Sequence, residues 1–264
     1  MHILVCVKQV PWTTEVKTDP ETGRLIRSGI ASVINPFDLY AIEEALRIKE
    51  EDGAEITALS MGPPQTQYAL RNALAMGCDQ AVLLSDRIFA GADTLATSYT
   101  LAQGIKKIGN INLIICGVKT TDGDTAQVGP GIAEELDIPH ACYVRKIRRI
   151  SNTSVIVEQE MDDGFRVLKI SMPCLLTVVK DINVPRMPTL EGKLTAVNKP
   201  LTIYTKNDLG GEELRYGVDG SATQVKKVFE PIHKTNGMLL PRNPQQAAKT
   251  LFQELVRLKV WKNE

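Results

Sequence analysis

The feature that most constrains the fold is a series of short apolar runs that alternate with segments of helical pattern. The runs occupy residues 3–7, 56–60, 81–85 and 112–117. They are largely apolar throughout, as in parallel strands that are covered on both faces. Helical patterns fill residues 39–51, 66–76 and the stretch from Asp93 to about Gly109. This order predicts an α/β fold with a doubly wound, mostly parallel sheet.

The pattern changes after His140. Residues 154–160 and 165–170 flank Asp162, Asp163 and Gly164 and predict a β-hairpin, whereas residues 174–179 predict another buried strand. A second hairpin or loop excursion is expected at 15–26, and the Pro-punctuated segment 183–199 indicates an ordered surface loop. We expect residues 1–200 to form the α/β domain. Residues 201–264 would form an arm, ending in an amphipathic helix at 245–259, that docks on another subunit rather than on its own chain.

Composition narrows the possible functions. The chain has 264 residues, and its 31 Lys and Arg balance its 31 Asp and Glu, so no net charge attracts it to nucleic acid or anionic lipid. No apolar run approaches the roughly 20 residues of a membrane-spanning helix, and Met1 leads directly into a strand without a targeting leader, so a cytoplasmic location is expected. The five Cys form no CxxC pair and the three His lie near no plausible nucleophile, so no metal site or catalytic triad is predicted. Any chemistry would come from a bound cofactor.

The strongest candidate for a binding site is the turn between the apolar run at 112–117 and a helical pattern that starts at about Thr125. A strand that leads into a helix through a Gly-rich turn leaves backbone N–H groups free to bind phosphate. Asp122 and Asp124 oppose this function unless they cap the helix or face a sugar. A capped loop without a ligand is an equally good interpretation. Neither of the usual nucleotide motifs, Gly-x-Gly-x-x-Gly after the first strand or the P-loop, is present.

The start of the helix near Asp93 allows a similar choice. Asp93 is a credible N-cap, which would explain it structurally. Gly91, Thr94 and Thr97 could equally face a bound nucleotide.

Several motifs in order resemble the β (small) subunit of electron transfer flavoproteins along the whole chain. They are VCVK at 5–8, NPF at 35–37, AIEEA at 41–45, ALAMG at 73–77, DGDTAQVG at 122–129, DDG at 162–164, PCLLT at 173–177 and PRMPTL at 185–190. The resemblance implies an adenine-nucleotide-binding fold and a heterodimer with a larger α subunit that carries one FAD. It also implies that Leu190 is the anchor by which the loop at 183–199 docks on a partner dehydrogenase.

The resemblance further implies which residues hold the nucleotide of this subunit, AMP in some members and a second FAD in the flavin-bifurcating group. Both the loop after residue 117 and the segment 89–97 resemble the bifurcating group, so FAD is expected, with AMP as the alternative. The implied cofactor-binding residues are Cys6, Asn35, Pro36, Phe37, Asp38, Met61, Gly91, Asp93, Thr94, Thr97, Gly117, Val118, Lys119, Thr120, Thr121, Asp122, Gly123, Asp124, Thr125, Ala126, Gln127 and Val128. Asp122 and Asp124 would then cap the helix and meet sugar or amide groups.

In such a protein NADH would deliver a hydride to the flavin of this subunit. One electron would go to ferredoxin or flavodoxin, and the other through the α-subunit FAD to an acyl-CoA dehydrogenase-like or other flavin dehydrogenase, for example in enoyl-CoA reduction. The chain would be a redox subunit without a side-chain acid, base or nucleophile of its own. Two alternatives stay open: a non-bifurcating carrier that holds AMP structurally, and a stand-alone nucleotide-binding regulatory module.

Overall fold

A computed structural model describes residues 1–12, 32–226 and 237–260. The chain divides into two compact units, Met1–Lys227 and Val228–Glu264. Within the described residues, no helix has the length and apolar character needed to cross a bilayer.

The first unit is built on a nine-stranded sheet with the strand order β11-β5-β4-β1-β6-β10-β7-β8-β9. Its strands are β1 (His2–Cys6), β4 (Glu55–Met61), β5 (Gln80–Leu84), β6 (Leu113–Gly117), β7 (His140–Ile150), β8 (Ser154–Met161), β9 (Gly164–Ser171), β10 (Cys174–Val178) and β11 (Leu201–Tyr204). The strands from β11 to β7 pair in parallel, and β7, β8 and β9 pair antiparallel. Two short strands, β2 (Gln9–Pro11) and β3 (Ser32–Ile34), form a separate antiparallel pair.

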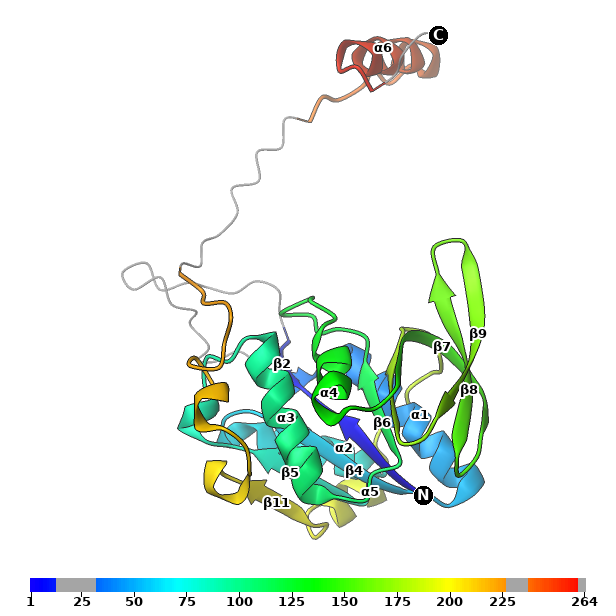
Figure 1. Cartoon of the computed structure of the whole chain (residues 1–264). Coiled ribbons are helices and arrows are strands. Elements are labelled where there is room, and N and C mark those ends of the chain that lie inside the picture. The colour runs from blue at the N-terminus through cyan, green and yellow to red at the C-terminus, as the bar shows by residue number, and fades with distance from the viewer. Residues whose placement is uncertain (13–31, 227–236, 261–264) are drawn as a thin grey trace. The chain divides into compact units, whose positions relative to one another are not determined.

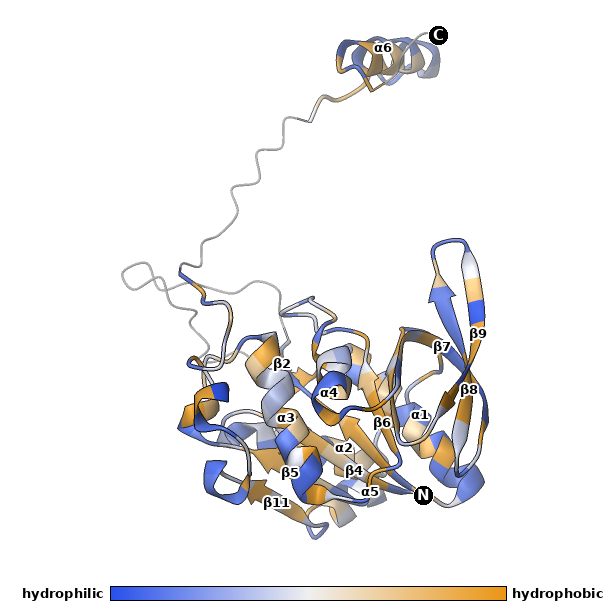
Figure 2. Ribbon diagram, viewed as in Figure 1, coloured by the Kyte–Doolittle hydropathy of each residue, from blue (hydrophilic) through white to orange (hydrophobic). Residues whose placement is uncertain are grey.

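Helices cover both faces of the sheet. The core on one face contains residues of α1 (Pro36–Asp52) and α2 (Gln67–Met76), and the core on the other contains residues of α3 (Thr94–Ile108) and α4 (Val128–Leu136). Figure 1 shows α3 and α4 on the near face and α1 on the far face. The central strands are hydrophobic, whereas the tip of the β8–β9 hairpin is hydrophilic (Figure 2). The predicted doubly wound sheet and the Asp-Gly hairpin are therefore confirmed.

Short elements complete the description. They are the 3-10 turns η1 (Pro64–Thr66), η2 (Arg87–Phe89), η3 (Lys206–Asp208) and η4 (Glu213–Arg215), and the helices α5 (Leu190–Ala196) and α6 (Pro244–Arg257). Helix α5 lies inside the segment that was expected to be a loop. The excursion expected at 15–26 falls outside the described residues.

Two strands of the sheet were not predicted. β7 is half exposed and rich in Arg and Lys, so it lacks the continuous apolar run of its parallel neighbours. β11 is four residues long and pairs with β5 at the edge of the sheet. Because β11 belongs to the sheet, the compact α/β unit extends to Lys227 and not to the expected boundary at residue 200.

Candidate functional site

The sheet has a topological switch point at β1, where the helices that follow β1 and β6 cover opposite faces. β1 lies between β4 and β6, and its Cys6 pairs with Leu59 on one side and Cys116 on the other. In doubly wound sheets, ligands bind outside the carboxyl ends of the strands at this switch point. The loops that follow β1 and β6 therefore lie at the expected position of a ligand.

Asn35 ties these loops together. Its buried side chain donates from Nδ2 to Oδ1 of Asp38, at 2.9 Å, and to the carbonyl of Lys119, also at 2.9 Å. Its Oδ1 accepts from the N–H of Thr121 at 3.2 Å, and its own N–H donates to the carbonyl of Lys8 at 2.8 Å. One side chain thus joins the exit of β1, the start of α1 and the loop after β6.

Asp38 supports the same junction from inside. Its Oδ2 accepts from the N–H of Lys8 at 2.7 Å. Gly117 packs so closely on it that an added Cβ would lie 2.5 Å from Oδ1 of Asp38 and 2.7 Å from the carbonyl carbon of Phe37. Burial raises the pKa of the Asp38 carboxyl to about 7. Asp38 therefore positions the backbone of the site and faces the protein interior.

The two acidic residues of the loop form ion pairs and do not cap the helix, which corrects the sequence-based expectation. Asp122 pairs with Nζ of Lys8 at 2.8 Å, and Asp124 pairs with Nζ of Lys119 at 2.7 Å. Burial opposes ionisation of Asp122, but the charge and hydrogen bond of Lys8, together with hydrogen bonds from Thr120 and the backbone, outweigh it and lower the pKa of the carboxyl. The N-cap of α4 is Gln127, whose side chain makes no capping hydrogen bond. Each carboxylate of the loop is thus balanced by a cation.

The loop also takes a longer path than predicted before the helix begins. Asp124 and Ala126 both have positive φ, at 53° and 54°. Residues in this left-handed conformation cannot continue a right-handed helix. α4 therefore starts at Val128 and not at Thr125.

The N-termini of α3 and α4 lie side by side next to this loop. Oγ of Ser98 donates to the carbonyl of Thr94 at 2.7 Å and to that of Val128 at 3.2 Å. Oγ1 of Thr94 lies 3.2 Å from Oε1 of Gln127. First-turn N–H groups have no partner within their own helix and carry the positive end of its dipole. Asp93 occupies those of α3, whereas α4 has no side-chain cap, so the start of α4 favours an anion.

Asp93 is the N-cap of α3, which was the structural alternative to its expected role as a cofactor-binding residue. Its Oδ1 accepts from the N–H groups of Leu95 and Ala96, at 3.0 and 3.1 Å. Its Oδ2 accepts from the N–H and Oγ1 of Thr223, at 2.9 and 3.0 Å. Both oxygens are therefore engaged within the protein.

The residues around Thr223 were missed from the sequence. Oγ of Ser221 accepts from the N–H of Asp93 at 2.8 Å. Gly91 has φ of 74°, and an added Cβ would meet Val218 at 2.6 Å. No motif marks this segment, because its role depends on a contact with a residue about half the chain away.

The remaining predicted residues fall into two groups. Cys6, Met61 and Thr97 lie at the carboxyl ends of β1 and β4 and in the first turn of α3, at the same edge of the sheet as the loop. Hydrogen bonding to Cys6 and burial raise the pKa of the Cys116 thiol, so Cys116 is a core thiol. Leu190 lies elsewhere, on α5, which packs against α2.

The arrangement suits binding and not acid–base chemistry. The start of α4 and the backbone and hydroxyl groups of the loop can hold the phosphates and sugar of a nucleotide. The carboxylates of the loop are paired with Lys8 and Lys119. Among the described residues, no group of three His, Cys, Asp or Glu side chains could hold a metal ion. Lys8 also belongs to the site, because it pairs with Asp122, but it was absent from the predicted set. Its position directly after the apolar run of β1 could have indicated that it lies at the site.

Comparisons with known proteins show the family to which the chain belongs. The family model of the electron transfer flavoprotein domain matches residues 22–205. The chain is 46% identical over 256 residues to the electron transfer flavoprotein subunit beta of Thermoanaerobacterium thermosaccharolyticum, a match that covers 97% of this chain and 98% of that protein. It is 48% identical over 241 residues to the caffeyl-CoA reductase-Etf complex subunit CarD of Acetobacterium woodii, covering 91% and 92% of the two chains.

A further relative is the protein FixA of Sinorhizobium fredii, at 41% identity over 263 residues and 97% and 92% coverage. The family model spans more than half of the chain, and the identities extend over nearly its whole length. The chain therefore belongs to the electron transfer flavoprotein family, as a β subunit that works in electron transfer with an α subunit and a dehydrogenase.

Proposed function

We propose that this β subunit binds FAD at the carboxyl edge of its sheet and serves a flavin-bifurcating electron transfer flavoprotein. The observation that supports it most is the uncapped start of α4 beside a loop whose carboxylates are balanced by Lys8 and Lys119. A pyrophosphate brings negative charge, which this helix start attracts and the balanced loop does not repel.

The chain's own residues would bind and orient the cofactor. The loop from Gly117 to Val128 would surround the phosphates and sugar, and Thr94 and Thr97 would form the opposite wall. Asn35, Asp38 and Asp93 would hold this backbone in place, because their side chains are occupied by protein groups. The bound flavin would supply the redox chemistry, taking two electrons from NADH and passing them singly to ferredoxin or flavodoxin and to the α-subunit FAD.

The name of one relative supports the kind of dehydrogenase that is served. The 48% identical chain is named as a subunit of a caffeyl-CoA reductase-Etf complex. We propose by analogy that this chain serves an acyl-CoA dehydrogenase-like flavoprotein that reduces an enoyl-CoA. The exposed Leu190 of α5 would be the side chain that anchors it.

A structural AMP at the same edge is the second candidate, because the start of α4 would hold one phosphate as well as two. The resemblance of the segments 89–97 and 118–128 to the bifurcating group favours FAD. The stand-alone regulatory module loses its support, because the chain belongs to a family that works as a subunit of a heterodimer.

The deciding experiment is to purify the chain together with its α subunit, extract the nucleotides and record the visible spectrum. We expect two FAD per heterodimer, and NADH oxidation that requires both a low-potential acceptor and the dehydrogenase. One FAD plus one AMP, with no reaction with NADH, would establish the AMP alternative and refute bifurcation.

A further inference from the structure

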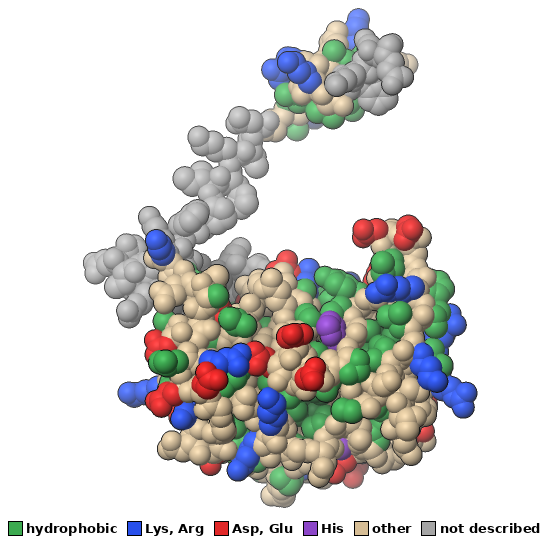
Figure 3. Space-filling view, viewed as in Figure 1, with side chains coloured by type: hydrophobic (Ala, Val, Ile, Leu, Met, Phe, Trp, Pro, Cys, Tyr) green, Lys and Arg blue, Asp and Glu red, His purple; other side chains and the backbone are tan. Residues whose placement is uncertain are grey.

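The segment 183–199 presents an unusual number of apolar side chains to solvent. Five of them, spread over the loop and α5, are between 66% and 83% exposed: Val184, Met187, Leu190, Leu194 and Val197. Contiguous exposed apolar groups of this kind mark interaction sites. Figure 3 shows, by contrast, interspersed acidic and basic side chains over much of the α3–α4 face.

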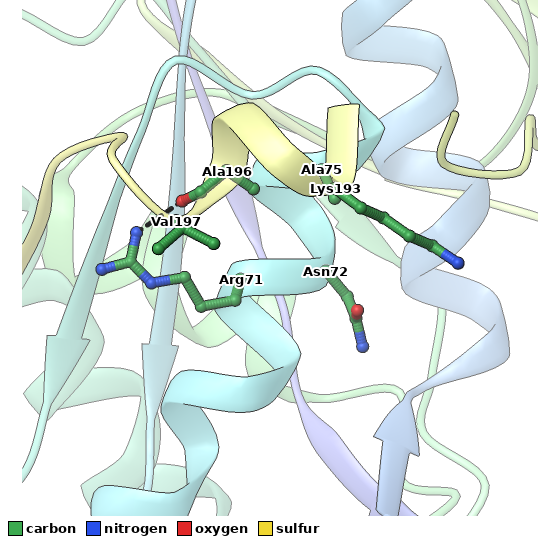
Figure 4. Close-up of a pocket in the computed structure, with 6 residues that line it drawn as sticks. All are labelled: Arg71, Asn72, Ala75, Lys193, Ala196 and Val197. Carbon is green, nitrogen blue, oxygen red and sulfur yellow. Dashed lines mark hydrogen bonds between the residues drawn. The ribbon is translucent and has the colours of Figure 1, made fainter. Parts of the chain in front are cut away.

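The C-terminal part of the segment is held on α2. Nη1 of Arg71 donates to the carbonyls of Ala196 and Lys199, both at 2.7 Å. Thr189 caps α5 by accepting from the N–H of Gly192 at 2.9 Å. Figure 4 shows Arg71 reaching Ala196 beneath α5, beside a hollow of about 350 Å³ between the two helices.

The N-terminal part is held on α1, mainly by Arg186. Its N–H and Nε donate to Oε2 of Glu43 at 3.0 and 2.8 Å, and its Nη2 donates to Oε1 at 2.9 Å. Its Nη1 and Nη2 also bond Glu50. The Glu43 side chain is only 5% exposed, so removing the guanidinium would leave a nearly buried carboxylate with only the more distant Arg47 beside it.

Asn183 adds a second attachment to the same helix. Its Nδ2 donates to the carbonyl of Tyr40 and to Oε2 of Glu44, both at 2.9 Å. Leu190, four residues after Arg186, begins α5, which has only seven residues. A helix of this length is not stable on its own. The orientation of the apolar side chains therefore depends on the attachment of the segment to α1 at one end and to α2 at the other.

We propose that Arg186 is a positioning residue for the dehydrogenase partner, because its ion pairs with Glu43 and Glu50 hold the apolar segment ready to dock. This rests on the proposed function, in which Leu190 anchors that partner. A segment that is ordered before it binds avoids the entropy cost of ordering during association. Arg186 itself need not touch the partner.

The test uses the complex with its α subunit and a short-chain acyl-CoA dehydrogenase reduced with butyryl-CoA as the electron donor. Arg186→Gln should raise the KM for the dehydrogenase roughly tenfold, with kcat and FAD content unchanged, because only docking is affected. Arg186→Lys should recover part of the loss, since an ammonium can pair with one carboxylate but cannot make the forked contact. Arg47→Gln is the matched control, because Arg47 also pairs with Glu43, at 3.6 Å, but lies outside the segment.

Amide hydrogen exchange distinguishes a local loss of order in the segment 183–199 from a general loss of stability. In Arg186→Gln we expect faster exchange in peptides covering 184–197 and unchanged exchange in β1, β4 and β6. An unchanged KM in Arg186→Gln, while Leu190→Ala raises it, would overturn the positioning role alone. An unchanged KM in Leu190→Ala would overturn the docking role in the proposed function, and the positioning role with it.

Discussion

Individual residues decide how an acidic loop can accept an anionic cofactor. Asp122 and Asp124 alone would repel a pyrophosphate. Lys8 and Lys119 bind them, and these cations come from the ends of β1 and β6, which the parallel pairing of those strands brings together. Charge balance is therefore a consequence of strand order.

Replacing Lys8 by Gln should leave Asp122 unpaired and weaken FAD binding by roughly fivefold, about 1 kcal/mol, as expected for a partly exposed pair. The double variant Lys8→Gln, Asp122→Asn should bind FAD as the wild type does, because no unpaired charge remains. Fluorescence titration of the flavin-free complex with FAD measures both. A double variant as weak as Lys8→Gln would mean that Lys8 contacts the cofactor itself.

The buried carboxyl of Asp38 should make stability depend on pH. Its pKa of about 7 in the folded chain lies above the usual value of 3.8, so the folded state binds the proton more tightly than the unfolded state. Its contribution to stability is then complete at pH below about 4 and is lost as the pH rises towards 7, with a slope of at most about 1.4 kcal/mol per pH unit.

Urea unfolding of the wild type and of Asp38→Asn, from pH 5 to pH 8, measures this contribution as a difference between the two curves. The free energy of unfolding of Asp38→Asn should fall less steeply with rising pH than that of the wild type, because the variant has no carboxyl at this position. Parallel curves would show that Asp38 titrates at an ordinary pH.

At the scale of elements, the site depends on how closely α3 and α4 approach. Gly131 of α4 packs directly on Ser98 of α3, and an added Cβ would lie 2.9 Å from Cβ of Ser98 and closer still to its hydroxyl. Gly129 meets Thr177 of β10 in the same way, at 2.5 Å. Glycine at these two positions lets both helix starts reach the same point.

Gly131→Ala should therefore lower the free energy of unfolding by about 1–3 kcal/mol and weaken FAD binding as well, because the added methyl separates the two helix starts. Thermal unfolding and FAD titration measure the two effects. Gly210→Ala is the control, since its added Cβ would lie 3.8 Å from the nearest atom, Oε1 of Gln103. Unchanged FAD affinity in Gly131→Ala would show that the phosphates do not depend on the paired helix starts.

At the scale of the whole molecule, the chain consists of an α/β unit and a separate C-terminal unit. Within the latter, Asn243 caps α6 by accepting from the N–H groups of Gln245 and Gln246, at 3.1 and 3.2 Å. The helix has 14 residues, with Leu251, Phe252 and Val256 towards one side. A single helix of this length is marginal in water and cannot bury an apolar side by itself. We therefore retain the prediction that it docks on the α subunit.

Phe252→Asp should weaken the association with the α subunit at least roughly tenfold, because a charge would enter an apolar contact. Thr250→Asp, on the opposite side of the helix, should leave association unchanged. Analytical ultracentrifugation of the two complexes tests this. Equal effects of the two substitutions would mean that α6 does not dock through its apolar side.

The sequence by itself determined the parallel core and the Asp-Gly hairpin, and it offered the cap of α3 as one of two interpretations of Asp93. Each of these depends on a local pattern: a continuous apolar run, a turn dipeptide, or an Asp directly before a helix. Only the tertiary structure decided the edge strand β11 and the late start of α4. It also decided three pairings: Asp122 with Lys8, Asp93 with Thr223, and Arg186 with Glu43. The side chains in the last three pairs are 114, 130 and 143 residues apart in the chain. Contacts between such distant residues exist only once the order of the strands has brought them together, so no local pattern could reveal them.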